Sequence, residues 1–167
     1  MEFVAVGSLL LGILVGAILS SRSRGFDVAL DRNMKDKLKE LPPLFERAHA
    51  TIDIATDFDD HFFGDEKVKQ SLKSAIDRGA KIRFLTEREA LDWYKDQAQI
   101  EIKCVEKLPY HTMVVDDRIV RVEKPHEPLT FGEDKHDVAL IFKGFPTLAA
   151  KYGREFQKLW TTLSSSL

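Results

Sequence analysis

Cysteine is nearly absent from this sequence of 167 residues, in which Cys104 is the only one. A single thiol excludes a disulfide within the chain and fits a reducing compartment. Net charge is also small, because 25 Lys and Arg stand against 27 Asp and Glu, which gives a formal charge of −2. The charge balance therefore supports no nucleic-acid partner and gives no whole-chain attraction to anionic lipid.

Charged residues are missing from one long stretch, Phe3 to Ser21. As a helix it would reach about 28 Å, close to the ~30 Å hydrocarbon core of a bilayer. A secretory signal peptide is an alternative, but Met1-Glu2 supplies no basic segment ahead of it. Arg22 and Arg24 follow directly, and basic residues favour the cytoplasmic side. We therefore expect residues 1–22 to be a single-pass membrane anchor, with the C-terminal domain in the cytoplasm.

Residues 23–41 are expected to form a linker and a juxtamembrane helix, because their second half is charge-dense with sparse apolar positions at helical spacing. Pro42-Pro43 is expected to interrupt that helix. Residues 42–167 form the expected domain, in which strand-like and helix-like apolar patterns alternate. This order predicts an α/β fold, a mixed β-sheet flanked by helices with a parallel pair at its centre. The expected strands are 50–56, 81–86, 100–105 and 136–142, and the expected helices are 65–78, 87–95 and 146–163.

A hairpin is expected between the third and fourth of these strands. Residues 112–115 are rich in strand-forming side chains, and Ile119, Val120 and Val122 form a second alternating run. Asp116-Asp117 lies between the two runs, and Asp tolerates turn geometry. Two short strands joined by a tight acidic turn follow from this pattern.

The hairpin and its surroundings resemble one repeat of the phospholipase D superfamily. The resemblance covers Leu41 to Leu163, and besides the hairpin it rests on Ala48–Ala55, Ile76–Leu85 and Phe156–Trp160. It implies a phospholipase D-like fold. Single-repeat members typically pair as dimers, so that two hairpins meet at one phosphate site, and a homodimer is therefore expected. Non-catalytic relatives include effector-sensing halves of some archaeal transcriptional regulators.

The resemblance also implies a catalytic motif that this sequence does not preserve. Members carry a His nucleophile, a Lys two residues on that binds phosphate, an Asp at the turn, and a later Gly-Ser and Asn. With Asp116 in the Asp position, Pro109 stands at the nucleophile and His111 at the Lys. Glu123-Lys124 then replaces the Gly-Ser, and Glu127 replaces the Asn. Proline cannot attack phosphorus, and the new carboxylates would repel a phosphodiester.

A second register does not restore the motif. If His111 occupies the nucleophile position, Met113 occupies the position of the motif Lys and Arg118 the position of the motif Asp. His111 alone could still serve as a general acid or base, or it could be a strand histidine that hydrogen-bonds a neighbour. The only candidates for catalysis are His111 and Asp116, and the candidate ligand-binding residues are His111, Asp116, Arg118, Lys124 and His126.

Two polar clusters invite a metal-site interpretation, but neither has ligand spacing that predicts one. His126 and His136 lie in or beside an acidic loop without the regular spacing of a ligand pair. Asp57, Asp59 and Asp65 follow a strand and precede a helix, so they are expected to cap helix N-termini. No metal and no cofactor are expected.

The sequence therefore predicts a membrane-anchored, catalytically inactive phospholipase D-like domain that works as a ligand- or partner-binding module in sensing or regulation. The alternative is a phosphodiesterase, acting on lipid or nucleic acid, with a remodelled active site at His111. A structural membrane-proximal domain without a ligand site is the third possibility. An intact His-x-Lys, which would favour the enzyme, occurs nowhere in the sequence.

Overall fold

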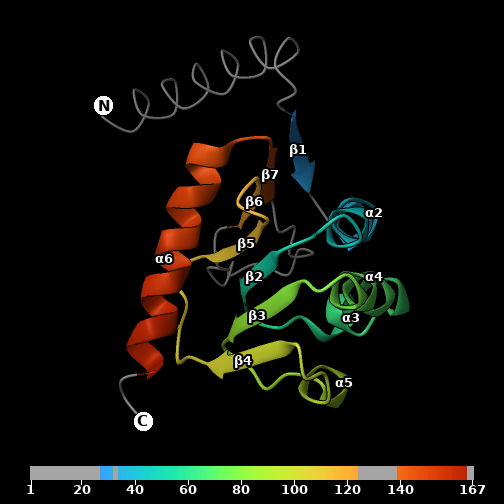
Figure 1. The fold of residues 1–167 in the computed structure, drawn as a ribbon, viewed down its shortest axis with the longest axis vertical. Helices are drawn as coiled ribbons and strands as arrows, with labels where there is room; N and C mark the ends of the chain where they lie inside the picture. The colour runs from blue at the N-terminus through green and yellow to red at the C-terminus, as the bar shows by residue number, and fades with distance from the viewer. Residues whose placement is uncertain (1–26, 32–33, 124–138, 165–167) are drawn as a thin grey trace, which may run out of the picture.

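A computed structural model describes residues 27–31, 34–123 and 139–164. A seven-stranded sheet of order β1-β7-β6-β5-β2-β3-β4 lies between α6 on one face and the remaining helices on the other (Figure 1). The strands are β1 (Asp27–Asp31), β2 (Thr51–Thr56), β3 (Lys81–Thr86), β4 (Ile100–Cys104), β5 (His111–Val115), β6 (Ile119–Glu123) and β7 (Ala139–Lys143). The helices are α2 (Met34–Phe45), α3 (Asp60–Phe63), α4 (Glu66–Asp77), α5 (Asp92–Lys95) and α6 (Pro146–Ser164).

The sheet is mixed, as the sequence predicted. Strands β2, β3 and β4 are parallel, and the crossover between β2 and β3 contains α3 and α4. Strands β5, β6 and β7 are antiparallel neighbours, and β5 joins this half to the parallel half by pairing with β2. The two halves of the sheet therefore meet at the boundary between β2 and β5.

Helix α4 illustrates how the larger core forms. Its apolar residues recur at helical spacing, so they lie on one face and are buried against the sheet. Asp65 accepts a hydrogen bond from the backbone N–H of Lys67 and caps the first turn, and Gly79 ends the helix with a φ of +90°. Both ends agree with the sequence prediction. The buried residues of the helix are Val68, Ser71, Leu72, Ala75 and Ile76.

An aromatic cluster fills the same core below the carboxyl ends of β2 and β3. The Phe58 ring stacks on Phe63 at a centroid distance of 4.7 Å and meets the edge of Tyr94 at 5.1 Å. The Tyr94 hydroxyl donates to the backbone carbonyl of Phe63 at 2.8 Å, which satisfies the one polar group of a fully buried side chain.

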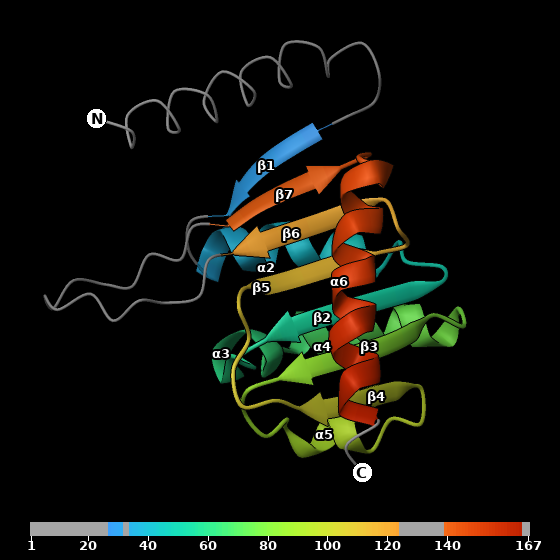
Figure 2. The same ribbon diagram turned by 90° about the vertical axis from the view of Figure 1, so that its left-hand side faces the viewer.

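Helix α6 covers the opposite face alone and runs across the strands (Figure 2). Phe156 and Trp160 stack at 5.7 Å on its inner face and are 3% and 7% exposed. Arg83 of β3 donates two hydrogen bonds of 2.7 Å to Asp53 of β2 and one of 2.7 Å to Gln157. The guanidinium also lies over both α6 rings, so ionic and aromatic contacts together hold the helix on the sheet.

The segment that the sequence assigned to a linker belongs to the domain. Strand β1 pairs with β7 along its whole length, and α2 packs against α4. Lys143 of β7 forms ion pairs with Glu40 of α2 at 3.0 Å and with Asp27 of β1 at 3.4 Å. Helix α2 also continues through Pro42-Pro43, because burial of Leu41 and Phe45 outweighs the two lost backbone hydrogen bonds. Residues 27–31 and 34–45 are therefore part of the fold.

The helix expected over 87–95 is shorter in the structure. Only Asp92–Lys95 is helical within the segment 87–95. The expected membrane span, Phe3 to Ser21, lies outside the described residues. Within 27–31, 34–123 and 139–164, no helix combines the length and apolarity needed to cross a bilayer.

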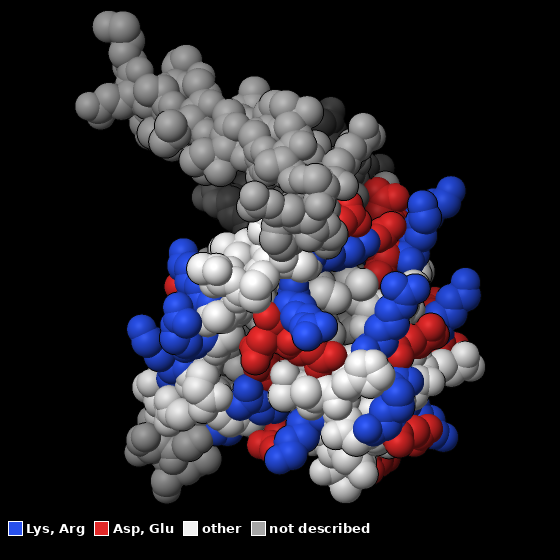
Figure 3. All heavy atoms as spheres, turned by 45° about the horizontal axis from the view of Figure 1, so that its top comes forward, with Lys and Arg blue, Asp and Glu red and all other residues white. Residues whose placement is uncertain are grey.

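On the face drawn in Figure 3, basic and acidic side chains lie intermixed.

Candidate functional site

The acidic turn of the hairpin has the conformation that its sequence predicts. Asp116 and Asp117 both have positive φ, at 51° and 53°, and the N–H of Arg118 donates to the carbonyl of Val115 at 3.1 Å. Two central residues with positive φ define a type I′ turn, whose twist matches that of the flanking strands. Aspartate tolerates this conformation better than most residues that bear a side chain.

The carboxylate of Asp116 binds the backbone at the start of β2. It accepts hydrogen bonds from the N–H groups of His49 and Ala50, both at 2.8 Å, and of Thr51 at 3.0 Å. Partial burial alone would raise the pKa of Asp116, but these three donors outweigh it and hold the pKa below the ordinary value. The carboxylate therefore joins the hairpin turn to β2, and this role is structural.

The structure separates the residues that the sequence grouped as one candidate site. His111 is buried at the start of β5 and pairs with Glu123 of β6. Asp116 follows the other end of the strand, about 16 Å away at the rise of an extended chain. Arg118 is exposed beside the turn. Lys124 and His126 lie outside the described residues.

A buried ion pair lies next to His111. Arg121 donates to Glu123 at 2.6 Å, and the two side chains are 6% and 4% exposed. Burial would raise the pKa of Glu123, but the charges of Arg121 and Lys37, the hydrogen bond from Arg121 and the charge of His111 outweigh it and lower the pKa. Glu123 is therefore a carboxylate at neutral pH.

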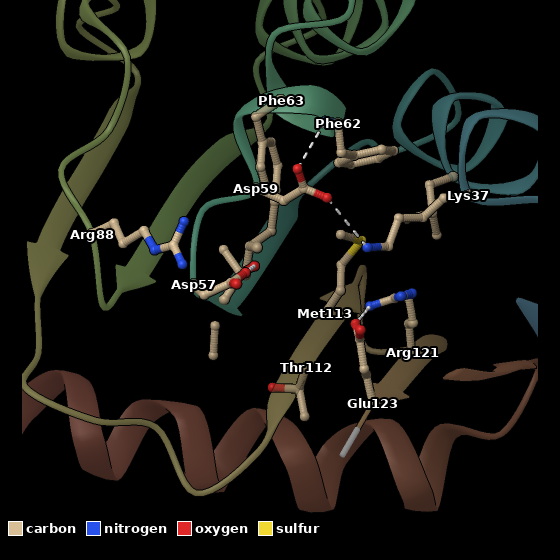
Figure 4. A pocket seen from close by; sticks show the side chains of 14 residues that line it. Lys37, Asp57, Asp59, Phe62, Phe63, Arg88, Thr112, Met113, Arg121 and Glu123 are labelled. Atoms are coloured by element: carbon tan, nitrogen blue, oxygen red, sulfur yellow. Dashed lines mark hydrogen bonds and ion pairs between the residues drawn. The ribbon is translucent and has the colours of Figure 1, made fainter. Parts of the chain in front are cut away.

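This ion pair forms one wall of a cavity of about 150 Å³ (Figure 4). The cavity lies at the boundary of β2 and β5, beyond the carboxyl ends of β2 and β3. Ligands of open α/β sheets bind at such ends, where the chain connections diverge. The lining residues belong to the helices α2 and α3 and to the strands β2, β3, β5 and β6 or the chain directly after them. They are Lys37, Leu41, Ile54, Ala55, Thr56, Asp57, Asp59, Phe62, Phe63, Arg88, Thr112, Met113, Arg121 and Glu123.

The backbone after β2 places two carboxylates at the cavity. Phe58 has a φ of +58°, a left-handed conformation that costs free energy in a bulky residue, and its fully buried ring offsets this cost. The turn directs Asp57 to the cavity, while Asp59 accepts from the N–H groups of His61 and Phe62 and caps α3. The other oxygen of Asp59 lies 3.8 Å from Lys37 of α2.

Arg88 reaches the cavity from the chain that follows β3. The Thr86 hydroxyl donates to the carbonyl of Arg88 at 2.7 Å and accepts from its N–H at 3.1 Å. These two bonds fix the backbone, and Figure 4 shows the guanidinium directed at the cavity. The sequence analysis did not single out Lys37, Arg88 or Arg121, and it expected Asp57 to cap a helix, whereas Asp57 lines the cavity. Asp57 and Arg88 each follow a predicted strand, which was an available signal.

A metal site is not apparent in the described part of the chain. Within 27–31, 34–123 and 139–164, no three His, Cys, Asp or Glu side chains lie close enough together to hold an ion. His126 and His136, which the sequence analysis considered, lie outside these ranges.

Comparisons with known proteins agree with the fold. No family model and no curated protein matches the sequence. Among solved structures, NucT from Helicobacter pylori is similar with a TM-score of 0.63 at 16% identity, over 81% of this chain and 96% of that one. Nuc from Salmonella typhimurium, described as a phospholipase D family member, gives 0.58 at 13%, over 81% and 95%. TrmBL2, described as an archaeal chromatin protein with a novel mode of DNA binding, gives 0.61 at 17%, over 96% of this chain and 62% of that one. The chain therefore has a phospholipase D-like fold.

Proposed function

We propose that this chain is a membrane-anchored module of phospholipase D-like fold that binds a ligand or partner and does not hydrolyse phosphodiesters. The observation that carries the proposal is the buried ion pair of Arg121 and Glu123. The resemblance implies that Glu123 occupies the position of a pocket-lining glycine. A glutamate at that position removes space where a phosphate would have to bind, and its carboxylate already engages the neighbouring cation, Arg121.

The strand that should carry the catalytic pair supports the same proposal. Pro109, at the implied nucleophile position, has no group that attacks phosphorus and is exposed ahead of β5. His111, at the implied Lys position, is 5% exposed and does not have the ammonium group that binds phosphate in the family. Dimerisation would not change this, because both subunits have the same residues.

The cavity favours a binding module over a purely structural domain. It lies at the sheet position where ligands bind in open α/β folds, and charged side chains from several elements converge on it. A domain with only a structural role has no need of such a concentration of charge around an open space. We therefore place ligand binding at this cavity.

Three further parts of the proposal concern partners. The apolar stretch Phe3 to Ser21 anchors the chain in a membrane, and Arg22 with Arg24 orients the domain to the cytoplasm. The domain forms a homodimer, as the resemblance to single-repeat members implies. Nucleic acid is not included among the partners, because the net charge is −2 and Figure 3 shows acidic side chains among the basic ones.

One observation favours the alternative of a remodelled phosphodiesterase. His111 and Glu123 are direct partners across the β5–β6 ladder, and a carboxylate beside a histidine can orient it for proton transfer. The two proposals differ in one measurable property, which is turnover.

The test is hydrolysis of a phospholipid and of single- and double-stranded DNA by the full chain, beside an active phosphodiesterase as a positive control. The proposal predicts product at the level of the buffer blank. Product that increases in proportion to the protein would contradict it. Sedimentation of the same sample measures the dimer, and a monomer at all concentrations would contradict that part alone.

A further inference from the structure

We propose that the cavity between β2, β5 and α3 binds a small zwitterion, with the anionic group of the ligand on Arg88 and its ammonium group on Asp57. This inference rests on the proposed binding function and names the ligand class for that site. Three observations support it. The charges of the described residues that line the cavity are balanced, only two of these have no partner in the cavity wall, and the cavity volume is small.

The charged side chains of the cavity wall are balanced in sign. Among the described residues that line it, three are basic and three are acidic, so these six side chains carry no net charge when all are ionised. A ligand with a single charge would leave that charge uncompensated, whereas a zwitterion adds no net charge. The six residues are Lys37, Arg88, Arg121, Asp57, Asp59 and Glu123.

Four of these charges already satisfy one another. Arg121 pairs with Glu123 at 2.6 Å, and Lys37 lies 3.8 Å from Asp59. Among the residues that the structure describes, Arg88 and Asp57 have no ion-pair partner, and Asp57 accepts only one long hydrogen bond, 3.4 Å from the Thr56 hydroxyl. One cation and one anion thus remain for a ligand, and both side chains line the cavity.

The chemistry of these two groups assigns the two ends of the ligand. A guanidinium presents two parallel N–H donors that match a carboxylate, so Arg88 suits the anionic end. A carboxylate accepts several hydrogen bonds from an ammonium group, so Asp57 suits the cationic end. The backbone of both is fixed, by the Thr86 hydroxyl at Arg88 and by the left-handed turn at Phe58, so the two ends are held before binding.

The volume limits the length of the ligand. A cavity of about 150 Å³ is the size that accommodates benzene in an engineered protein, so the ligand has roughly six to ten non-hydrogen atoms. Small amino acids with separated charges, such as β-alanine and 4-aminobutyrate, have this size. A nucleotide or an intact phospholipid does not fit.

The experiment is calorimetric titration of the full chain with β-alanine and 4-aminobutyrate, beside butyrate and butylammonium as analogues with one charge. We expect at least one zwitterion to bind, and each single-charge analogue to bind about 10- to 100-fold more weakly, because each lacks one charged hydrogen-bonding group. No detectable binding of either zwitterion would overturn the proposal, as would equal binding of butyrate.

Two variants locate the site. Arg88→Gln and Asp57→Asn change side chains that are not fully buried, and each is expected to weaken binding about 10- to 100-fold. Arg154→Gln removes an exposed cation from α6, outside the cavity, and is expected to leave binding unchanged. Equal affinity in all three variants would overturn the assignment, and circular dichroism checks that each is folded.

The result is independent of the test for hydrolysis. Zwitterion binding together with phosphodiester turnover would support this site and contradict the non-catalytic proposal. No zwitterion binding together with no turnover would overturn this site and leave the non-catalytic proposal standing.

Discussion

Glu123 and Arg121 form an ion pair of 2.6 Å in which both side chains are almost completely buried. The residues are two apart on β6, so they lie on the same face of the sheet and meet without any distortion of the strand. A buried pair of this kind adds little to stability compared with apolar residues, but removal of one partner is costly because it leaves the other charge in the interior.

Glu123→Gln should therefore destabilise the fold by about 3 kcal/mol at neutral pH, because the Arg121 charge loses its carboxylate. Urea denaturation of the wild type and the variant measures this difference. Glu106→Gln is the matched control, since Glu106 is exposed, and it should change the free energy of unfolding by less than about 0.5 kcal/mol. Equal midpoints for Glu123→Gln and the control would contradict burial of the pair.

The loss of stability in Glu123→Gln should also depend on pH. Folding lowers the pKa of Glu123 from its ordinary value of 4.5, so its contribution is fully present above that value and is lost as pH falls through the lower folded pKa. The difference between wild type and Glu123→Gln should therefore narrow as pH decreases below 4.5. Urea denaturation curves of both proteins across this acidic range measure the difference in their free energies of unfolding. A difference that widens as pH falls would contradict the prediction.

Asp116→Asn should destabilise the fold by about 1–2 kcal/mol, because three backbone N–H groups lose a charged acceptor that is partly screened by water. The carboxylate contribution should also be lost as pH falls below about 3.9, since folding lowers this pKa. Asp117→Asn is the control next to it, with the same substitution, a similar φ and an exposed side chain. If the two variants unfold at the same urea concentration, Asp116 does not join the hairpin to β2 as described.

Trp160→Ala should cost about 3–5 kcal/mol, because the indole is buried against Phe156 and its loss leaves a cavity that relaxes only partly. Lys158→Ala on the exposed face of α6 provides the control and should be nearly neutral. Thermal and urea unfolding measure both variants. An unchanged midpoint for Trp160→Ala would mean that α6 does not dock on the sheet in solution.

The parts of the fold that the sequence predicted are those with strong local signals. Asp116-Asp117 between two β-branched runs specified the hairpin, and Asp65 with Gly79 marked the ends of α4. The inner face of α6 was recognisable from Phe156 and Trp160 at helical spacing. Each of these signals acts over a few residues, so no knowledge of the rest of the chain was needed.

The parts that were not predicted depend on contacts between distant residues. Strand β1 exists because it pairs with β7, more than 100 residues later, and its own sequence is short with an Asp at each end. The cavity brings Lys37, Asp57, Arg88 and Glu123 together from four segments, and each is an ordinary charged residue in its local sequence. His111 and Asp116 were grouped because the resemblance assigns both to one catalytic motif, but the strand between them holds its two ends apart.

The proposed anchor has its own test. Expressed full-length protein should remain in the membrane pellet after carbonate extraction, and deletion of residues 2–22 should release it, because Phe3 to Ser21 supplies about the length of a bilayer span. Protease added outside sealed inside-out vesicles should digest the domain, and protease added to right-side-out vesicles should not. Extraction of the full-length protein by carbonate would contradict the anchor, and the opposite protease pattern would contradict its orientation.

The most direct test of the central claim is single-turnover hydrolysis of a labelled phosphodiester, with the wild-type chain in excess over substrate and His111→Ala measured in parallel. Excess protein reveals even one slow event per molecule, and a denaturing quench kept at alkaline pH would retain a phosphohistidine, whose P–N bond hydrolyses in acid. Because Pro109 supplies no nucleophile and Glu123 takes up space where a phosphate would bind, both proteins should match the buffer blank and carry no label. Hydrolysis by the wild type that His111→Ala abolishes would contradict the account and establish the remodelled phosphodiesterase.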